Sequence, residues 1–185
     1  MVLCGLGRIL SDKPGSEQQA QKHLDDGEKL FRDLGEPRSL AMIYIAKSYL
    51  LAKRRRYRQA EAYLQVAIER LREIKNPYLL GEALSALCKL YYDQAVEGGE
   101  EARQERFARL NQIWQEVPGG VIEGLGELFS IHYSRMQGLL GRAWLQQGRS
   151  EQGMKLLCRA TETGLSYNKY VSDASVSSET SASPS

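Results

Sequence analysis

The sequence contains few of the residues that bind metal ions or form disulfides. Its 185 residues include three cysteines (Cys4, Cys88 and Cys158) and two histidines (His23 and His132). An odd set of widely separated cysteines favours buried thiols in a reducing cytosol over a disulfide framework. The same reducing environment indicates a cytoplasmic location. A zinc site needs closely spaced His or Cys ligands, and because no such pair occurs we expect no metal site.

Long apolar runs and a strong excess of charge are also missing. The longest uncharged run is 39–46, whereas a membrane-spanning helix needs about 20 apolar residues. The apolar segment 1–10 has no basic residue before its apolar part, which argues against a secretory signal. With 25 Lys and Arg against 23 Asp and Glu, the formal net charge is +2. Neither a membrane nor nucleic acid is therefore expected as the default partner.

Motifs of catalytic and nucleotide-binding sites are absent from the sequence. No glycine is followed by lysine, as a phosphate-binding loop requires, and no Gly-x-Ser-x-Gly sequence occurs. The glycine-rich stretches 4–7 and 124–126 lack the third glycine of a dinucleotide fingerprint. Neighbouring carboxylates such as Asp25 and Asp26 do not face one another on a helix. We expect a protein that is not an enzyme, with no catalytic residue and no cofactor.

Prolines are few, but their spacing is the most informative feature of the sequence. Three of the five, Pro37, Pro77 and Pro118, lie 40 and 41 residues apart. A fixed period in this range indicates a repeat architecture, and proline marks the junctions because it cannot continue a helix. Apolar residues keep the same 40-residue offset on one face of a helix, namely Ala20 and Ala60, Leu24 and Leu64, Phe31 and Leu71, and Leu34 and Ile74.

This period predicts an all-α protein built from about four helix-turn-helix repeats. The pairs of helices cover about 2–34, 38–75, 78–116 and 121–164. The stretch 121–147 is long enough to form one extended helix or two helices broken near Ser130. The repeat domain would then occupy 1–164. The serine-rich segment 165–185 is expected to be a disordered tail, because it cannot bury enough apolar surface to offset its ordering entropy.

The last pair resembles a tetratricopeptide repeat (TPR). The matching positions are Leu140, Gly141, Trp144, Gly148, Gly153, Leu157 and Ala160, although the family has alanine at the position of Gly153. Earlier pairs resemble the pattern more loosely, at Leu6, Gly7, Leu10, Ala20, Leu24, Gly27, Tyr57, Ala60, Leu64, Ala67, Leu87, Cys88 and Tyr91. The long period is similar to the roughly 40-residue repeats of bacterial signalling proteins, including MalT-like sensor arrays attached to regulatory ATPases.

Glycine at these positions has a physical reason. Where two helices cross, a residue without a Cβ lets the backbones approach closely, and we expect this at Gly141 and Gly153. Large residues such as Trp144, Tyr91 and Leu157 would fill the space between neighbouring helices. Since one pair cannot bury its apolar face alone, the pairs are expected to stack.

The resemblance implies a right-handed α-solenoid whose first helices line a concave surface and bind a peptide or helix of a protein partner. On this basis the partner-facing residues are expected to be Ile43, Lys47, Leu50, Ala83, Leu87, Leu90, Arg135 and Arg142. Their mixed apolar and cationic character favours an amphipathic or acidic peptide. A carboxylate clamp of the kind that binds chaperone tails is not expected, because the three asparagines, Asn76, Asn111 and Asn168, lie outside the first helices.

Two other functions remain open from the sequence. One is a sensor segment of a larger ATPase or transcription regulator. The other rests on a basic cluster of five cations in six residues at a helix–helix turn: Lys53, Arg54, Arg55, Arg56 and Arg58. Such a cluster is typical of a site for phosphate, RNA or an acidic partner. It is also typical of an exposed turn whose cations favour the C-terminal end of the preceding helix, and nucleic-acid binding is the less favoured interpretation.

The first helix has an apolar start without a capping residue. A terminal repeat usually presents a polar outer face to solvent. The start at Val2, Leu3, Leu6 and Ile9 therefore suggests either a missing upstream neighbour or self-association through this helix.

Overall fold

The computed structural model describes residues 17–117 and 127–164. All regular secondary structure in these residues is helical, and no strand occurs among them, which confirms the all-α prediction. The helices are α2 (Glu17–Asp33), α3 (Pro37–Lys53), α4 (Tyr57–Glu73), α5 (Pro77–Glu97), α6 (Glu100–Glu116) and α8 (Glu127–Gln146), followed by a last helix over 150–164. Residues 2–16 of the first predicted pair, with the predicted self-association of its apolar start, and the predicted tail at 165–185 lie outside the described residues.

The first four described helices begin at a strict interval. They start at residues 17, 37, 57 and 77, and α2, α3 and α4 each contain 17 residues. The 40-residue period of the sequence is therefore two equal halves, each a helix followed by a three-residue connection. Pro37 and Pro77 are the first residues of α3 and α5, where proline is tolerated because the first helical N–H has no intrahelical partner.

The same backbone turn follows α2, α3, α4 and α8. In each turn one residue has a positive φ: Gly35 (65°), Arg55 (58°), Lys75 (50°) and Gly148 (77°). Two backbone hydrogen bonds close each turn, for example Arg55 N–H to Ala52 O and Arg56 N–H to Leu51 O, both at 2.9 Å. This is the Schellman motif, which satisfies the last carbonyl groups of a helix.

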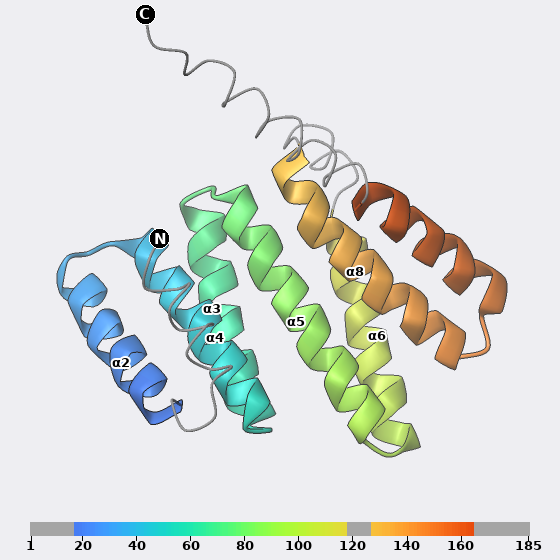
Figure 1. The fold of residues 1–185 in the computed structure, drawn as a ribbon, viewed down its shortest axis with the longest axis horizontal. Helices are drawn as coiled ribbons and strands as arrows, with labels where there is room; N and C mark the ends of the chain where they lie inside the picture. The colour runs from blue at the N-terminus through green and yellow to red at the C-terminus, as the bar shows by residue number, and fades with distance from the viewer. Residues whose placement is uncertain (1–16, 118–126, 165–185) are drawn as a thin grey trace, which may run out of the picture. The chain divides into compact units, whose positions relative to one another are not determined.

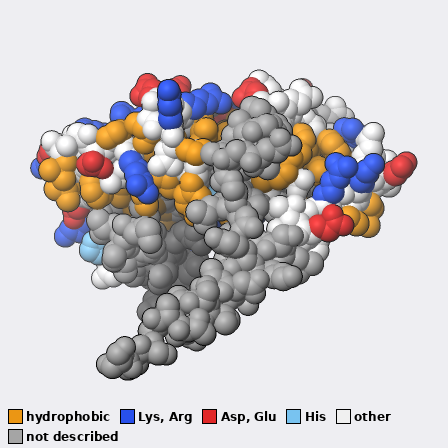
Figure 2. All heavy atoms as spheres, turned by 90° about the horizontal axis from the view of Figure 1, so that it is seen from above, with side chains coloured by type: hydrophobic (Ala, Val, Ile, Leu, Met, Phe, Trp, Pro, Cys, Tyr) orange, Lys and Arg blue, Asp and Glu red, His pale blue; other side chains and the backbone are white. Residues whose placement is uncertain are grey.

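The chain divides into two compact units. The N-terminal unit covers Met1–Arg109 and the C-terminal unit covers Leu110–Ser185, so the boundary lies within α6. In the N-terminal unit, α2 packs on α3, α3 on α4 and α4 on α5, and α3 also contacts α5 (Figure 1). The α2–α3 and α4–α5 turns lie at the same end of this unit. On the face seen in Figure 2, hydrophobic side chains lie among Lys and Arg side chains.

Helices α3 and α4 differ in how much of their surface is buried. On α4 the buried positions form one face, including Ala60, Leu64, Ala67 and Leu71. On α3 the buried positions surround the helix: Leu40, Ala41, Ile43, Tyr44, Ile45, Ala46, Lys47, Ser48, Leu50 and Leu51. The difference arises because α3 contacts α2, α4 and α5 together. A helix enclosed in this way lacks the one-sided pattern that normally identifies its exposed face.

In the C-terminal unit, α8 runs through Ser130 without interruption, so the predicted break near Ser130 does not occur; residues 121–126 of the predicted stretch lie outside the described residues. A Cβ added to Gly153 would lie 2.8 Å from the carbonyl oxygen of Gly141, and one added to Gly141 would lie 3.0 Å from that of Gly153. The predicted close crossing of these two glycines is thus confirmed. Nearby, the Trp144 indole N–H donates to Asn111 Oδ1 at 2.8 Å, which anchors α8 on the end of α6.

Candidate partner-binding surface

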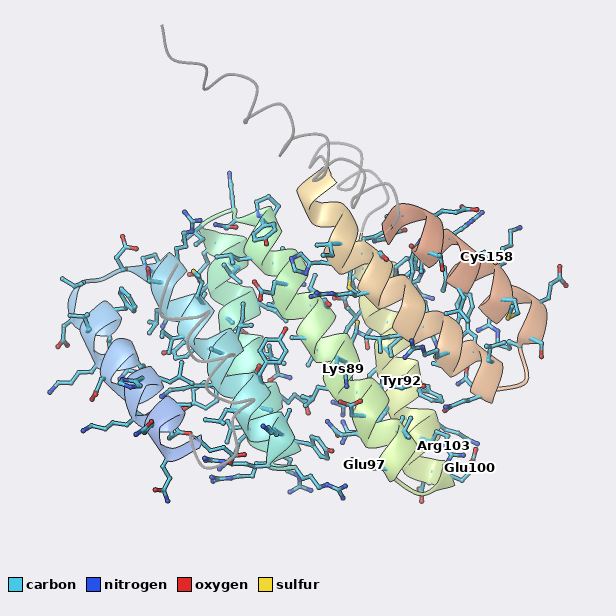
Figure 3. The ribbon with its side chains drawn as sticks, in the orientation of Figure 1. Lys89, Tyr92, Glu97, Glu100, Arg103 and Cys158 are labelled. Atoms are coloured by element: carbon cyan, nitrogen blue, oxygen red, sulfur yellow. The ribbon has the colours of Figure 1, made fainter. Side chains whose placement is uncertain are left out.

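One face of helix α5 carries several of its most exposed side chains. Tyr78, Glu82, Lys89, Asp93 and Val96 are exposed or half-buried and recur at intervals of three, four or seven residues, the spacing of a single helix face. Leu80, Leu84 and Gln94, on other sides of the helix, are half-buried. Tyr78 and Val96 are 43% and 47% exposed although both are large and apolar. Figure 3 labels Lys89 on α5. The Lys89 ammonium forms an ion pair with Asp93 one turn away, at 2.6 Å.

Helix α3 repeats this stripe 40 residues earlier. Arg38, Met42, Tyr49 and Lys53 occupy the positions equivalent to Tyr78, Glu82, Lys89 and Asp93, and all four are exposed or half-buried. We call these two sets of residues on α3 and α5 the outer stripe. It combines apolar and charged side chains on consecutive first helices of the same unit.

The structure places most of the predicted partner-facing residues in the core. Six of them, Ile43, Lys47, Leu50, Ala83, Leu87 and Leu90, are buried. A shift by one residue reaches the outer stripe for four of these, for example from Ile43 to Met42 or from Ala83 to Glu82, whereas Ala46 and Ala86, which precede Lys47 and Leu87, are buried as well. One residue rotates the face by about 100°. The other two predicted residues, Arg135 and Arg142, are exposed and share one side of α8.

A signal in the sequence could have located this stripe. In α5 the charged residues Glu82, Lys89 and Asp93 interrupt an otherwise apolar helix at helical spacing. Charged side chains are seldom fully buried without partners, so these residues mark the exposed face more reliably than an alignment of apolar positions does.

Lys47 has a structural role because its charge is enclosed by the protein. Its ammonium forms ion pairs with Asp25, at 2.5 Å, and with Glu28, both on α2, and lies 5.6 Å from the centre of the Tyr63 ring on α4. Burial alone would lower the pKa of Lys47, but the hydrogen bonds to the two carboxylates outweigh it and raise the pKa above its usual value. The lysine therefore joins α2, α3 and α4 as a charged group.

A second polar cluster joins α4, α5 and α6. The Glu61 carboxylate accepts a hydrogen bond from the Tyr91 hydroxyl at 2.7 Å and pairs with Arg109 at 3.1 Å. The guanidinium groups of Arg106 and Arg109 lie 5.7 and 5.8 Å from the centre of the Tyr91 ring. Burial and the bond to Glu61 raise the pKa of Tyr91 to about 12. Glu61 thus holds three helices together rather than facing solvent.

The basic cluster of the α3–α4 turn is partly neutralised. Glu17 of α2 lies 3.2 Å from Arg54 and 3.9 Å from Lys53, and Glu97 of α5 lies 3.4 Å from Arg55. Arg56 and Arg58 are exposed, and neither forms an ion pair with any residue that the structure describes. Among the described residues, Glu17 and Glu97 thus pair with three of the five cations, and Arg56 and Arg58 lack a carboxylate partner.

The tyrosine beside this cluster is engaged by the protein. The Tyr57 hydroxyl donates a hydrogen bond to Glu97 at 2.6 Å. Partial burial, together with that hydrogen bond, raises the pKa of Tyr57 to about 12. Figure 3 shows Glu97 at the end of α5, next to Glu100 and Arg103 at the start of α6. Tyr57 thus serves to attach the turn to α5.

The cysteines are in different environments. Burial raises the pKa of the Cys88 thiol to about 12, as expected for a structural thiol, whereas Cys158 is exposed, so the prediction of buried thiols is wrong for Cys158. Within 17–117 and 127–164, no group of three or more His, Cys, Asp or Glu side chains could hold a metal ion. None of the helices in these ranges is long and apolar enough to span a membrane.

Comparison with known proteins finds no matching family model, no matching curated protein and no matching solved structure. The tetratricopeptide resemblance accordingly stays a prediction that rests on the residues quoted for it.

Proposed function

We propose that this chain is a non-enzymatic helical scaffold that binds a peptide or helix of a protein partner along the outer stripe of α3 and α5. The observation that carries the proposal is the repetition of the stripe at equivalent positions 40 residues apart. Two enclosed helices each leave one mixed apolar and charged face accessible, and side chains such as Met42, Tyr78 and Val96 offer apolar contact area on it.

The composition of the stripe favours an amphipathic partner. An amphipathic helix or extended peptide would place apolar side chains on Met42, Tyr78 and Val96, and its charged side chains near Arg38, Glu82 and Lys89. The resemblance to tetratricopeptide repeats supports the same assignment, because first helices line the binding surface in that family. Arg135 and Arg142 on α8 are candidates for a similar role in the C-terminal unit.

The test exchanges the charges of the Lys89–Asp93 pair. Peptides selected from a displayed library against the purified protein would be synthesised, and their Kd would be measured by fluorescence anisotropy. The double variant Lys89→Glu/Asp93→Lys retains an intrahelical ion pair and the net charge but inverts the charge pattern of the stripe. We expect it to weaken binding about ten-fold or more, an effect typical of reversed charges across an interface.

The matched control is Lys29→Glu/Asp33→Lys. These two residues are exposed on α2, away from the outer stripe, and have the same four-residue spacing. The control should bind as the wild-type protein does. Unchanged binding by the Lys89→Glu/Asp93→Lys variant, or equal weakening by both variants, contradicts the proposed surface.

A further inference from the structure

The basic cluster forms a charged surface that the proposed peptide face does not explain. Only Lys53 belongs to both. The α3–α4 turn has the same backbone geometry as three other turns. Glycine occupies the positive-φ position after α2 and α8, whereas Lys75 occupies it after α4 and Arg55 occupies it here. A basic residue at this position is therefore shared with the α4–α5 turn, and the further cations Arg54, Arg56 and Arg58 are what distinguish the α3–α4 turn.

The protein itself does not satisfy the whole cluster. Glu17 and Glu97 engage Arg54 and Arg55, and they hold these two side chains beside α2 and α5. The guanidinium groups of Arg56 and Arg58 have no ion-pair or hydrogen-bond partner among the described residues. They flank Tyr57, the first residue of α4, whose first turn contains no acidic side chain. Two available guanidinium groups therefore lie at the start of a helix, where anionic groups are favoured.

We infer that the turn carrying Arg56 and Arg58 is a docking site for a short acidic segment of a protein partner. Guanidinium groups bind carboxylates through paired hydrogen bonds, and arginine clusters are a recurrent means of recognising acidic motifs. This inference does not depend on the outer stripe, because Arg56 and Arg58 lie outside it.

The same observations argue against nucleic acid at this turn. Nucleic-acid binding draws on a track of many phosphate contacts and on exposed aromatic rings for stacking. The basic cluster occupies one turn, and the carboxylates of Glu17 on α2 and Glu97 on α5 pair with part of it. Tyr57, the neighbouring aromatic residue, is attached to Glu97. A short segment with a few carboxylates fits this surface better than a phosphate backbone does.

The experiment measures binding of a fluorescein-labelled oligoglutamate peptide to the full chain by fluorescence anisotropy. Two further probes are an oligoglutamine peptide of the same length and an oligothymidylate of the same charge. We expect the protein to bind oligoglutamate in preference to both. The affinity should fall between about 50 mM and about 300 mM NaCl, because exposed ion pairs are screened by salt.

Two variants locate the binding. Arg56→Gln/Arg58→Gln is expected to weaken oligoglutamate binding about five-fold or more, since it removes two exposed charge pairs. Lys22→Gln/Lys29→Gln removes the same net charge from exposed positions of α2 and should bind as the wild-type protein does. Circular dichroism confirms that both variants fold.

Three results would overturn the inference. These are equal binding of oligoglutamate and oligoglutamine by the wild-type protein, equal effects of the two double variants, and tighter binding of oligothymidylate than of oligoglutamate. The last result would assign the turn to nucleic acid. A negative result in this experiment does not contradict peptide binding at the outer stripe, because the Lys89→Glu/Asp93→Lys variant tests that surface separately.

Discussion

Helix α3 in the N-terminal unit and helix α8 in the C-terminal unit each carry one basic side chain that is 4% exposed, Lys47 and His132. Lys47 faces two carboxylates, which raise its pKa above the usual value despite burial. His132 is desolvated and has Arg135 nearby, and its pKa is lowered to about 4. Burial disfavours the charged form of both side chains; the two carboxylates outweigh it at Lys47, whereas at His132 burial prevails and Arg135 adds to it.

Helices also come into close contact in different ways in the two units, around α3 in the N-terminal unit and between α8 and the last helix in the C-terminal unit. Between α3 and its neighbours the space is filled by large or paired side chains, such as the tilted rings of Tyr44 and Tyr63, 5.5 Å apart. Between α8 and the last helix, Gly141 and Gly153 allow backbone to meet backbone. Neighbouring helices in this fold can therefore pack through large side chains or through their backbones. Loss of a side chain should disrupt the first kind of contact, and addition of a side chain should disrupt the second.

The largest expected effect is charge reversal of the buried lysine. Lys47→Glu would place a third carboxylate beside Asp25 and Glu28, with the exposed Arg32, which pairs with Glu28, as the remaining cation, and we expect the free energy of unfolding to fall by about 4 kcal/mol or more. Urea denaturation followed by circular dichroism measures this change. The control Lys29→Glu, at an exposed position of α2, should change stability by no more than about 0.5 kcal/mol. Similar stability of the two variants would show that Lys47 is not a structural ion.

The histidine of α8 should make stability depend on pH in the acidic range. Its folded-state pKa of about 4 lies below the usual value of about 6.5. Protonation therefore favours the unfolded chain: the stability is complete above about pH 6.5 and is lost as the pH falls toward 4. We expect wild-type protein to lose about 2 kcal/mol between about pH 8 and about pH 5 from this group.

The variant His132→Gln isolates that contribution. Its unfolding free energy should fall less steeply than that of the wild-type protein over the same pH range, as measured by urea titrations at each pH. Parallel pH profiles would contradict the assignment of a neutral buried His132.

The glycine crossing predicts opposite effects of the same substitution at two positions. Gly153→Ala places a Cβ against the Gly141 carbonyl oxygen and should destabilise the protein by about 1–3 kcal/mol. Gly138→Ala, on α8, finds no atom within 4 Å and should stabilise it by up to about 1 kcal/mol through helix propensity. Melting temperatures from circular dichroism separate the two, and a shift in the same direction for both would rule out a tight crossing.

The smallest expected effect concerns the turns that end α3 and α8. Arg55 and Gly148 occupy the same positive-φ position, so Gly148→Ala should cost about 1 kcal/mol and Arg55→Gly should gain up to about 1 kcal/mol. Chemical denaturation measures both. A loss of stability in Arg55→Gly would mean that the ion pair with Glu97 outweighs the backbone strain.

Much of the helical layout was predictable from local sequence. Prolines 40 residues apart and apolar residues at the same offset indicated the helix pairs from 38 to 116, and α3 and α5 begin within one residue of the predicted starts of their pairs. The residue types at Gly141 and Gly153 indicated a close helix crossing before any geometry was known. These features depend on backbone chemistry and short-range spacing, which the sequence contains directly.

The exposed face was not predictable in the same way. For α3 and α5 the prediction chose Ile43 and Ala83, which are buried, whereas Met42 and Glu82 just before them are half-buried on the outer stripe. Both helices are apolar on most sides, so the spacing of apolar residues indicates where each helix begins and ends but not which face is accessible. Six residues predicted to face a partner lie in the core as a result.

The sequence by itself determined that this protein is helical, where most of its helices begin and end, and where two helices can approach without side chains between them. Only the tertiary structure decided which stripe of α3 and α5 is accessible, why Lys47 is charged and His132 neutral, and which cations of the basic cluster remain available. The physical reason is the range of the interactions. Helix formation and turns depend on residues a few positions apart, whereas burial and pKa depend on side chains brought together from different helices, such as Glu28 beside Lys47 and Glu97 beside Arg55.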